Sequence, residues 1–381
     1  MSSRLRIAEI APLFEAVPPK LYGGTERIIS SLTEELVRRG HEVTLFASGE
    51  STTDARLIPG RDSALRLDPA PHKSPIAAHL AMLHDVRQQA DDFDVLHFHL
   101  SHFQHFPFFE HCPWKTLTTP HGRQDYRDLP HAIERWPMYN LNSISLRQRE
   151  PLPDANWIAN IYHGLPLDDP LPDRPDRGGE PYLAFLGRMS VEKRPDRAIE
   201  IARRSGMKLK LAAKIAPEDK AYYESTVEPL IDGETIEYVG EVDEAGKRAF
   251  LADAAALLFP IDWPEPFGLV VIEAMALGIP TIAWPNGAMP EIIDEGVTGF
   301  LVSSVEEAAV RARDAARLDR RAIRSVFERR FSLGRMVDEY EQVFHTLAEL
   351  QHRQGKTAAY PDQGAARRYG GHAATASRTT A

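Results

Sequence analysis

With 381 residues, 43% of them apolar and 26% charged, the chain is long enough for two compact domains with full cores. Its formal net charge of −10 argues against nucleic acid as a partner, because no basic excess is present to neutralise a phosphate backbone. A single cysteine, Cys112, excludes an intramolecular disulfide and a cysteine-based zinc cluster, and it fits a reducing, cytoplasmic location.

The amino-terminal region begins with a strand-like run at residues 5–11. The pair Gly23-Gly24 then opens a helical pattern with apolar positions at 28, 29, 32 and 36. A glycine pair at the start of a helix can cradle a phosphate or an acceptor, although such a pair is also an ordinary flexible turn.

Histidines crowd the next strand-like run, residues 94–100, and the loop after it. His97 and His99 are two residues apart, so their rings share one face of a strand, which is a feasible zinc spacing. With no cysteine and no obvious carboxylate to complete the set, we expect no metal there and assign His99 or His102 to the acceptor side of a cleft. Asp92-Phe93-Asp94 matches an Asp-x-Asp metal motif but precedes a strand, where that motif should follow one.

His121 follows the apolar run at residues 115–119, at the point where strand gives way to loop. A histidine in this position can face a cleft. The alternative is a histidine that closes the loop with a backbone hydrogen bond. Downstream, six basic or aromatic residues between 123 and 149 alternate with acidic ones, so a solvated face is a better interpretation than a membrane-binding patch.

Residues 168–180 are rich in proline, glycine and charge and lack apolar periodicity, which predicts a linker between domains at 1–167 and 181–332. Strand-like runs alternate with helical ones on both sides, which predicts two doubly wound parallel sheets with ligands bound at the carboxyl ends of strands, in the cleft between domains. The predicted strands are 5–11, 41–47, 94–100, 115–119, 156–162, 182–186, 207–213, 235–239, 256–260, 279–284 and 299–303.

The first strand of the second half, residues 182–186, runs into Gly187-Arg188 and, five residues on, Lys193. Two cations on a strand-to-helix loop, with a glycine giving backbone room, suit a diphosphate leaving group whose negative charge grows as a glycosidic bond breaks. Taken alone, the segment could equally be a surface loop with ordinary charges.

Glu265 and Glu273 are eight residues apart across the start of an apolar helix at 268–277. If helical, this spacing spans about 12 Å and places both carboxylates near one side, suited to two hydroxyl-bearing groups of a nucleotide sugar. The free amides of Phe267, Gly268 and Leu269 would bind a phosphate. Otherwise, Glu265 is a solvated turn residue and Glu273 pairs with a core arginine.

Residues 319–353 carry a helical pattern, whereas 355–381 are dominated by glycine, alanine, serine and threonine and are expected to be disordered. No segment resembles a signal peptide, and no apolar run approaches about 18 residues. We therefore expect no integral membrane segment, and peripheral membrane association stays open.

The run Glu265-Pro266-Phe267-Gly268 with Glu273 resembles the E-x-F-G-x-x-x-x-E hallmark of the retaining GT-B glycosyltransferases of family 4, and residues 187–193 are similar to their G-R-L-S-x-E-K-G loop. The resemblance implies the GT-B fold, two Rossmann-like domains facing across a cleft, with a last helix at 333–354 packing back on the first domain. It also implies an enzyme without metal or cofactor that moves a hexose from a UDP- or GDP-sugar to a hydroxyl of a carbohydrate or small-molecule acceptor.

By the same resemblance, each motif acquires a role. Arg188 and Lys193 bind the diphosphate beside Gly187, Glu265 contacts the donor sugar, Glu273 holds the ribose, His121 contributes to the sugar site, and Gly23 and Gly24 lie on the cleft floor. The chain departs from the family at Arg194, where glycine is expected and the side chain would add a phosphate contact or face water. It departs again at Tyr162-His163-Gly164, where Asn-Gly is commoner, which indicates a subgroup resembling the avilamycin-type transferases.

Two alternatives share these residues. Another GT-B enzyme, such as a nucleotide-sugar epimerase or a phosphorylase, would have the same fold. A catalytically idle sugar-nucleotide-binding protein would bind donor and never release free diphosphate.

Overall fold

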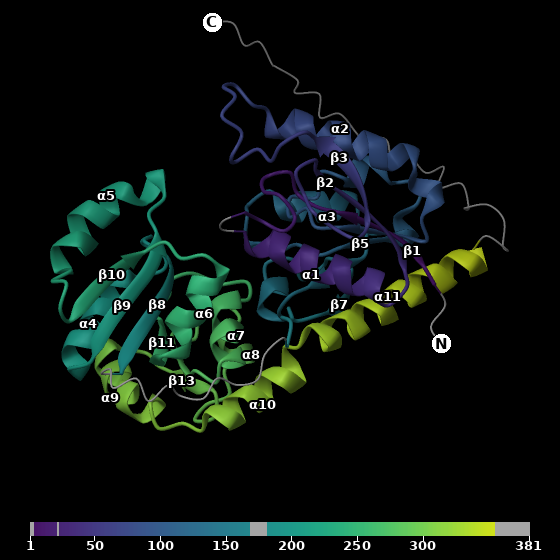
Figure 1. Ribbon diagram of the computed structural model, residues 1–381. Coiled ribbons are helices and arrows are strands. Elements are labelled where there is room, and N and C mark those ends of the chain that lie inside the picture. Colours follow the sequence, from purple (N-terminus) through teal and green to yellow (C-terminus); the bar gives the residue numbers. More distant parts are fainter. Residues whose placement is uncertain (1–3, 21–22, 168–180, 355–381) are drawn as a thin grey trace, which may run out of the picture.

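The computed structural model describes residues 4–20, 23–167 and 181–354, so the predicted linker and tail lie outside the described residues. Two parallel sheets, each covered by helices, form the two lobes of the molecule (Figure 1). The GT-B architecture predicted from the sequence is therefore confirmed.

The first sheet has the strand order β3-β2-β1-β4-β5-β6-β7, with every neighbouring pair parallel. Its strands are β1 (Arg6–Ile10), β2 (Glu42–Ser48), β3 (Arg56–Arg61), β4 (Val95–Phe98), β5 (Thr116–Thr118), β6 (Leu141–Ser143) and β7 (Trp157–Asn160). The strand-like runs had indicated five of these, and they missed β3 and β6.

The second sheet has the order β10-β9-β8-β11-β12-β13, again all parallel. Its strands are β8 (Tyr182–Arg188), β9 (Lys208–Lys214), β10 (Ile236–Gly240), β11 (Ala254–Phe259), β12 (Thr281–Ala283) and β13 (Gly299–Leu301). All six correspond to predicted runs. The central strand β11 is buried along its whole length, as expected of a parallel sheet with helices on both faces.

Helices connect the strands in the right order for two doubly wound units. They are α1 (Gly24–Arg38), α2 (Pro75–Gln88), α3 (Leu129–Arg135), α4 (Pro195–Ser205), α5 (Lys220–Tyr222), α6 (Glu244–Ala252), α7 (Leu269–Ala276), α8 (Met289–Ile292), α9 (Val305–Ala315), α10 (Arg320–Arg330) and α11 (Leu333–Gln354). In each sheet the strand order reverses at the first strand, between β1 and β4 and between β8 and β11, which is where open α/β sheets bind ligands.

The helical pattern over 319–353 forms two helices, because the chain turns at Phe331-Ser332, and the second has the bounds expected for the last helix, 333–354. The second of them, α11, crosses to the first sheet (Figure 1). There the Tyr340 hydroxyl lies 3.2 Å from Thr119 Oγ1 and accepts a hydrogen bond from Asn142 Nδ2 at 3.1 Å. Helix α11 thus completes the core beneath the first sheet. Within the described ranges, no helix combines the length and apolarity needed to cross a membrane.

Candidate active site

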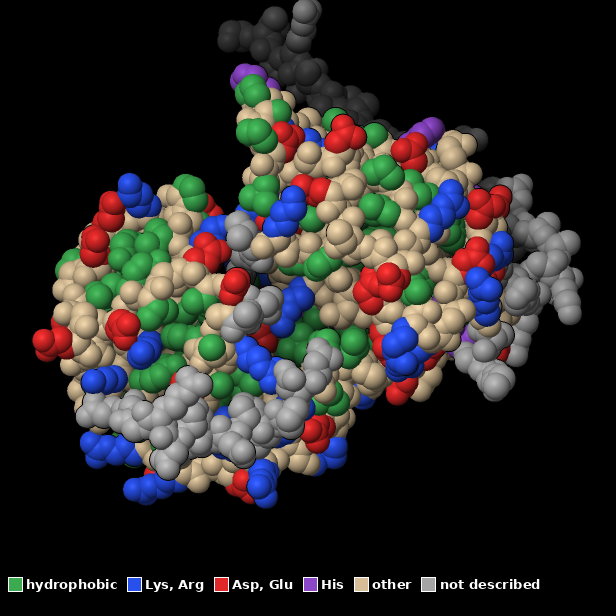
Figure 2. All heavy atoms as spheres, in the orientation of Figure 1, with side chains coloured by type: hydrophobic (Ala, Val, Ile, Leu, Met, Phe, Trp, Pro, Cys, Tyr) green, Lys and Arg blue, Asp and Glu red, His purple; other side chains and the backbone are tan. Residues whose placement is uncertain are grey.

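The starts of α1 and α7 meet where the two lobes face each other. A Cβ added to Gly24 would lie 3.1 Å from Leu269 Cδ1, so the glycine pair is in contact with the carboxylate-flanked helix of the second lobe. The lack of a side chain at Gly23 also lets Pro19 lie close to the backbone, since a Cβ added to Gly23 would lie 2.7 Å from the Cβ of Pro19. Figure 2 shows Lys and Arg side chains gathered in the hollow between the lobes.

Gly268 caps α7 with φ +89°, a conformation that only glycine adopts without strain. A Cβ there would lie 2.8 Å from Met289 Cε. The preceding Phe267 is buried, while Leu269 is partly exposed. The first amides of α7 therefore sit at a tight turn facing the other lobe, the arrangement that favours an anion.

Lys193 and Glu265, which are far apart in the sequence, lie in direct contact. Lys193 Nζ donates to Glu265 Oε2, and Trp263 Nε1 donates to the same oxygen at 2.9 Å. The ammonium group also lies 4.9 Å from the centre of the Trp263 ring. Both charged side chains are mostly buried, which holds their head groups in one place.

The expected helical spacing of the two carboxylates is wrong. Glu265 precedes the helix, because α7 begins at Leu269 and Gly268 is left-handed. The rise and rotation of a regular helix therefore do not relate Glu265 to Glu273. What brings Glu265 to the site is the backbone packing of its loop against Gly287, where a Cβ would lie 2.2 Å from the Glu265 carbonyl oxygen.

Glu273 is mostly buried and pairs with Arg27 of α1 and with Lys247 of α6, whose Nζ lies 3.6 Å away. Burial opposes ionisation of this carboxyl, but the two cations outweigh it and hold the pKa of Glu273 below its ordinary value. The arginine partner considered as an alternative is thus present, and it comes from the opposite lobe. Glu273 therefore ties the two lobes together.

Arg188 ends β8 among carboxylates. It donates to Glu192, and its Nε lies 3.5 Å from Asp219 Oδ2. Burial raises the pKa of Asp219, and Arg188 opposes that rise. Among the residues that the structure describes, no atom outside the neighbouring residues lies within 4 Å of a Cβ added to Gly187, so this end of the strand has open space on the glycine side. The sequence motif had not identified Asp219, which belongs to a different loop.

Arg194, the residue that replaces the family's glycine, adopts a left-handed conformation with φ +55° at the start of α4. Its guanidinium donates to Asp196 at 2.9 Å and to Asp262 at 3.0 Å. The side chain is therefore engaged by two carboxylates of its own lobe, rather than by solvent alone.

We expect Arg194→Gly to leave stability nearly unchanged, because relief of the left-handed strain, about 1–2 kcal/mol, offsets the lost ion pairs. Arg194→Ala loses the same pairs and keeps the strain, so it should be less stable than Arg194→Gly by about 1 kcal/mol in urea unfolding. Turnover should be retained in both variants. An Arg194→Gly protein that folds normally but loses turnover would instead assign Arg194 to the phosphate.

His121 does not join Glu265 or Lys193. Its Nε2 lies 2.8 Å from His99 Nδ1, and its Nδ1 lies 3.4 Å from His163 Nε2. The His163 ring packs edge-on against Phe267, with ring centres 4.9 Å apart. His121 thus connects to the donor-side loop through His163, a residue that the sequence had marked only as a departure from the family.

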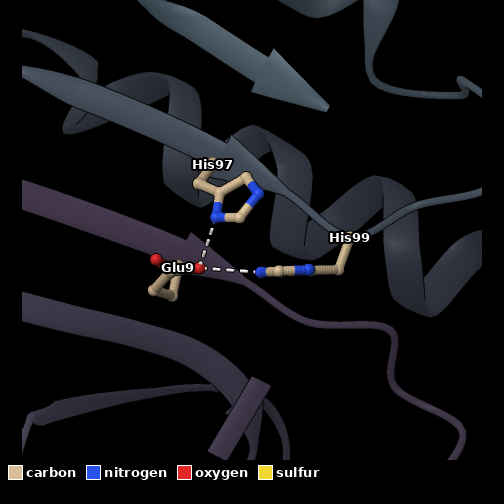
Figure 3. Close-up of side chains that lie close together, drawn as sticks. All are labelled: Glu9, His97 and His99. Carbon is tan, nitrogen blue, oxygen red and sulfur yellow. Dashed lines mark hydrogen bonds and ion pairs between the residues drawn. The ribbon is translucent and has the colours of Figure 1, made fainter. Parts of the chain in front are cut away.

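The carboxylate thought to be lacking near His97 and His99 is Glu9, on the neighbouring strand β1 (Figure 3). Glu9 Oε2 lies 2.7 Å from His99 Nε2 and 2.9 Å from His97 Nδ1, and all three side chains are buried. Ligand atoms of a tetrahedral zinc with bonds of about 2.0–2.1 Å lie about 3.3 Å apart. Both observed separations are shorter than this, so the side chains as they lie are too close together for a tetrahedral zinc, and the His99 contact is a hydrogen bond.

The other two histidines of this region lie apart from the cluster. His105 is buried, stacks on Phe98 and contacts Thr118 Oγ1 at 2.8 Å. His102 is exposed beside Tyr126. Of the two histidines expected on the acceptor side of the cleft, His99 is buried in the core, whereas the placement of His102 there stays a prediction.

Glu291 joins the lobes at the rim of the site. Its carboxylate accepts from the backbone amides of Leu146 and Arg147, each at 2.7 Å, and from the Tyr162 hydroxyl at 3.0 Å. Ser145 Oγ donates to the carbonyl of Pro266 at 2.7 Å. A cavity of about 400 Å³ lies alongside, lined by Arg147, Glu150, Asp262, Trp263, Pro264 and Asn286 among others.

Comparison with known proteins agrees with this geometry. The family model described as glycosyl transferases group 1 matches residues 172–325, and the model of glycosyltransferase family 4 matches residues 22–155. The phosphatidyl-myo-inositol mannosyltransferase of Mycobacterium leprae is 27% identical over 343 residues, which cover 80% of this chain and 85% of that protein.

Solved structures share the fold. AviGT4, a glycosyltransferase involved in avilamycin A biosynthesis, aligns with a TM-score of 0.64 and 23% identity over 91% of this chain and 98% of its own. HepE of Anabaena, in complex with UDP-glucose, aligns with a TM-score of 0.69 and 14% identity over 92% of this chain and 100% of its own.

Proposed function

The chain belongs to glycosyltransferase family 4, the group 1 glycosyl transferases, and we propose that it moves a hexose from a UDP- or GDP-sugar to an acceptor hydroxyl, with retention and without metal. As a member of that family it is a glycosyltransferase that uses a nucleotide-sugar donor. We propose, in addition, the identity of the sugar, the nucleotide and the acceptor, and the stereochemical outcome.

The observation that carries the proposal is the contact of Lys193 with Glu265 beside the amide end of α7. A diphosphate bound at those amides competes with Glu265 for the Lys193 ammonium. Once freed from Lys193, the Glu265 carboxylate accepts hydrogen bonds from hydroxyls of the sugar. Donor binding thus separates the ion pair that Lys193 and Glu265 form in the structure and gives each of them a new partner.

Groups of this chain then serve each step of the transfer reaction. Lys193, Arg188 and the amides of Gly268 and Leu269 stabilise the negative charge that develops on the departing diphosphate. Glu273, beside Arg27, holds the ribose. The acceptor oxygen attacks the anomeric carbon from the face that the diphosphate leaves, and a departing phosphate oxygen takes the hydroxyl proton. Because side chains and amides supply the positive charge, the proposal requires no divalent cation.

The test is thermal stabilisation by UDP-, GDP- and ADP-sugars in EDTA, followed by nucleoside diphosphate release from the donor that binds. UDP-glucose is the first donor to test, since HepE binds it. Stabilisation by one nucleotide class, with release that requires an acceptor, supports the proposal. Release that requires a divalent cation, conversion of the sugar without acceptor, or a requirement for inorganic phosphate contradicts it.

A further inference from the structure

The cavity of about 400 Å³ at the junction of the lobes has no part in the donor chemistry proposed above. Its volume falls in the range of about 300–1,000 Å³ that is typical of small-molecule sites. Arg147 and Glu150 of the first lobe line one part of it, and Asp262, Trp263 and Asn286 of the second lobe line another. A molecule bound there would therefore contact both lobes.

Hydrogen bonds between the lobes hold the walls of this cavity in place. Glu291 accepts from the backbone amide of Arg147 at 2.7 Å, and Ser145 Oγ donates to the Pro266 carbonyl at 2.7 Å. Arg147 belongs to the first-lobe wall, and Glu291 stands four residues after Gly287 in the second-lobe wall. The walls are thus joined without any ligand, which lowers the ordering cost of binding one.

Two contacts place the cavity next to Glu265. Trp263, which lines the cavity, donates from Nε1 to Glu265 Oε2 at 2.9 Å. Gly287, which also lines it, packs so closely that an added Cβ would lie 2.2 Å from the Glu265 carbonyl oxygen. Because Glu265 contacts the donor sugar in the proposed function, a ligand in the cavity would lie beside that sugar.

The polar groups of the cavity are mainly hydrogen-bond acceptors. Asn286 donates from Nδ2 to the Ile261 carbonyl at 2.9 Å, which leaves its Oδ1 to accept. The side chains of Glu150 and Asp262 are 61% and 52% exposed, so both carboxylates can accept from a ligand. A ligand that donates from several hydroxyl groups satisfies such a set of oxygens.

The same lining disfavours acceptors of other classes. Among the described residues that line the cavity, two are anionic and one is cationic, so a phosphorylated acceptor would meet net negative charge. A long acyl chain would take water from the carboxylates and leave them without partners. Trp263, Pro264 and Pro285 supply apolar surface for the C–H groups of a sugar ring.

We propose that this cavity binds the acceptor and that the acceptor is an uncharged saccharide, whose hydroxyls donate to Glu150, Asp262 and Asn286. The inference rests on the proposed function for the reaction. One hydroxyl oxygen of the saccharide, beside Glu265, forms the new bond to the anomeric carbon as the bond from that carbon to the diphosphate breaks. The hydroxyl proton goes to an oxygen of the departing diphosphate.

The binding test needs no donor. Protein labelled with ¹⁵N-tryptophan is titrated with the methyl glycosides of glucose, galactose and mannose and with maltose and cellobiose. The indole NMR signal of Trp263 is assigned from Trp263→Phe. At least one saccharide should shift this signal in a saturable way, and Glu150→Trp should abolish the shift, because the indole fills the cavity from the first-lobe wall.

Glu200→Trp provides the matched control. Glu200 is half exposed on α4 and pairs with Arg204 at 2.7 Å, much as Glu150 pairs with Arg147 at 2.8 Å. The control therefore loses the same kind of surface ion pair and gains the same side chain, outside the cavity. It should keep the shift of the Trp263 signal.

Turnover provides the second test. With UDP-glucose, or whichever donor is identified, KM for the saccharide that binds should rise about 5- to 10-fold in Glu150→Ala and in Asn286→Ala, because each variant loses one hydrogen bond to a hydroxyl. The affinity for UDP, measured by thermal stabilisation, should stay unchanged. A KM effect without loss of UDP affinity separates an acceptor contact from general damage to the site.

No shift of the Trp263 signal with any of these saccharides would overturn the proposal, as would a shift that persists in Glu150→Trp. So would a wild-type KM for the saccharide in both alanine variants, since the acceptor would then bind elsewhere. If no nucleotide sugar is turned over, the proposed function fails, while the titration still decides whether the cavity binds saccharides. If Glu150→Trp does not fold, Glu150→Ala takes its place in the titration and should weaken the binding.

Discussion

Replacement of Lys193 by alanine should lower kcat about 100- to 1000-fold, the typical effect of removing one group that stabilises developing negative charge. Affinity for the nucleoside diphosphate should fall about tenfold, because the ammonium also contacts the bound diphosphate. The reason lies in the position of Lys193, which is mostly buried and held between the Glu265 carboxylate and the Trp263 ring. Steady-state release of nucleoside diphosphate and calorimetric binding of UDP or GDP measure the two effects.

Lys210 provides a matched control in the same lobe. Its Nζ lies 3.3 Å from a Glu237 carboxylate oxygen and 4.9 Å from the centre of the Tyr182 ring, so Lys210→Ala loses the same kinds of contact as Lys193→Ala. We expect both variants to fold, and only Lys193→Ala to lose turnover. Near-wild-type turnover in a folded Lys193→Ala protein would remove Lys193 from the reaction.

Of the alanine substitutions at glycines in the site, Gly287→Ala should cause the largest loss of stability and activity. Its φ of +57° carries a strain of about 1 kcal/mol for alanine, and its Cβ would lie 2.2 Å and 2.3 Å from backbone atoms of Glu265. Crowding of this kind adds about 1–3 kcal/mol. We expect a loss of about 2–4 kcal/mol in urea unfolding and a kcat about 100-fold lower, because the backbone of Glu265 has to shift.

Gly296→Ala separates strain from crowding. Its φ is +72°, yet within the described part of the chain no atom outside the neighbouring residues lies within 4 Å of an added Cβ. This variant should lose only about 1 kcal/mol and keep its turnover. If both alanine variants show equal stability and equal activity, then Gly287 does not position Glu265.

The sequence predicted the parts of the site that lie on continuous segments. Lys193 stands in the loop after β8, and Glu265 and Gly268 stand in the segment that leads into α7, so local pattern located all three. Gly287 could not be found in this way, because its constraint is a backbone contact with another loop. Glu9 was missed for a similar reason, since its partners come from β4 and only sheet pairing brings β1 beside them.

The misses in the fold have local causes. β3 contains Pro59 and Gly60, residues that are unusual within strands, and it forms an edge of its sheet, where they are tolerated. β6 has three residues with a polar one at its centre, and so short a run does not show the alternation of apolar and polar residues that indicates a strand. The boundary between α10 and α11 at Phe331-Ser332 is not a miss, since it agrees with the last helix that the resemblance placed at 333–354.

The crossing of α11 also sets an order of events during synthesis. Tyr340 bonds Asn142 across a sequence separation of 198 residues, and Phe344 lies against the His97 ring. At about 5–20 residues per second, a ribosome takes about 10–40 s to make the intervening chain. Once β7 has been made, the first sheet is complete in sequence for the rest of that interval but lacks α11 as a covering helix. The nascent first lobe therefore exposes an apolar face during this time, and a chaperone that recognises apolar surface can bind that face.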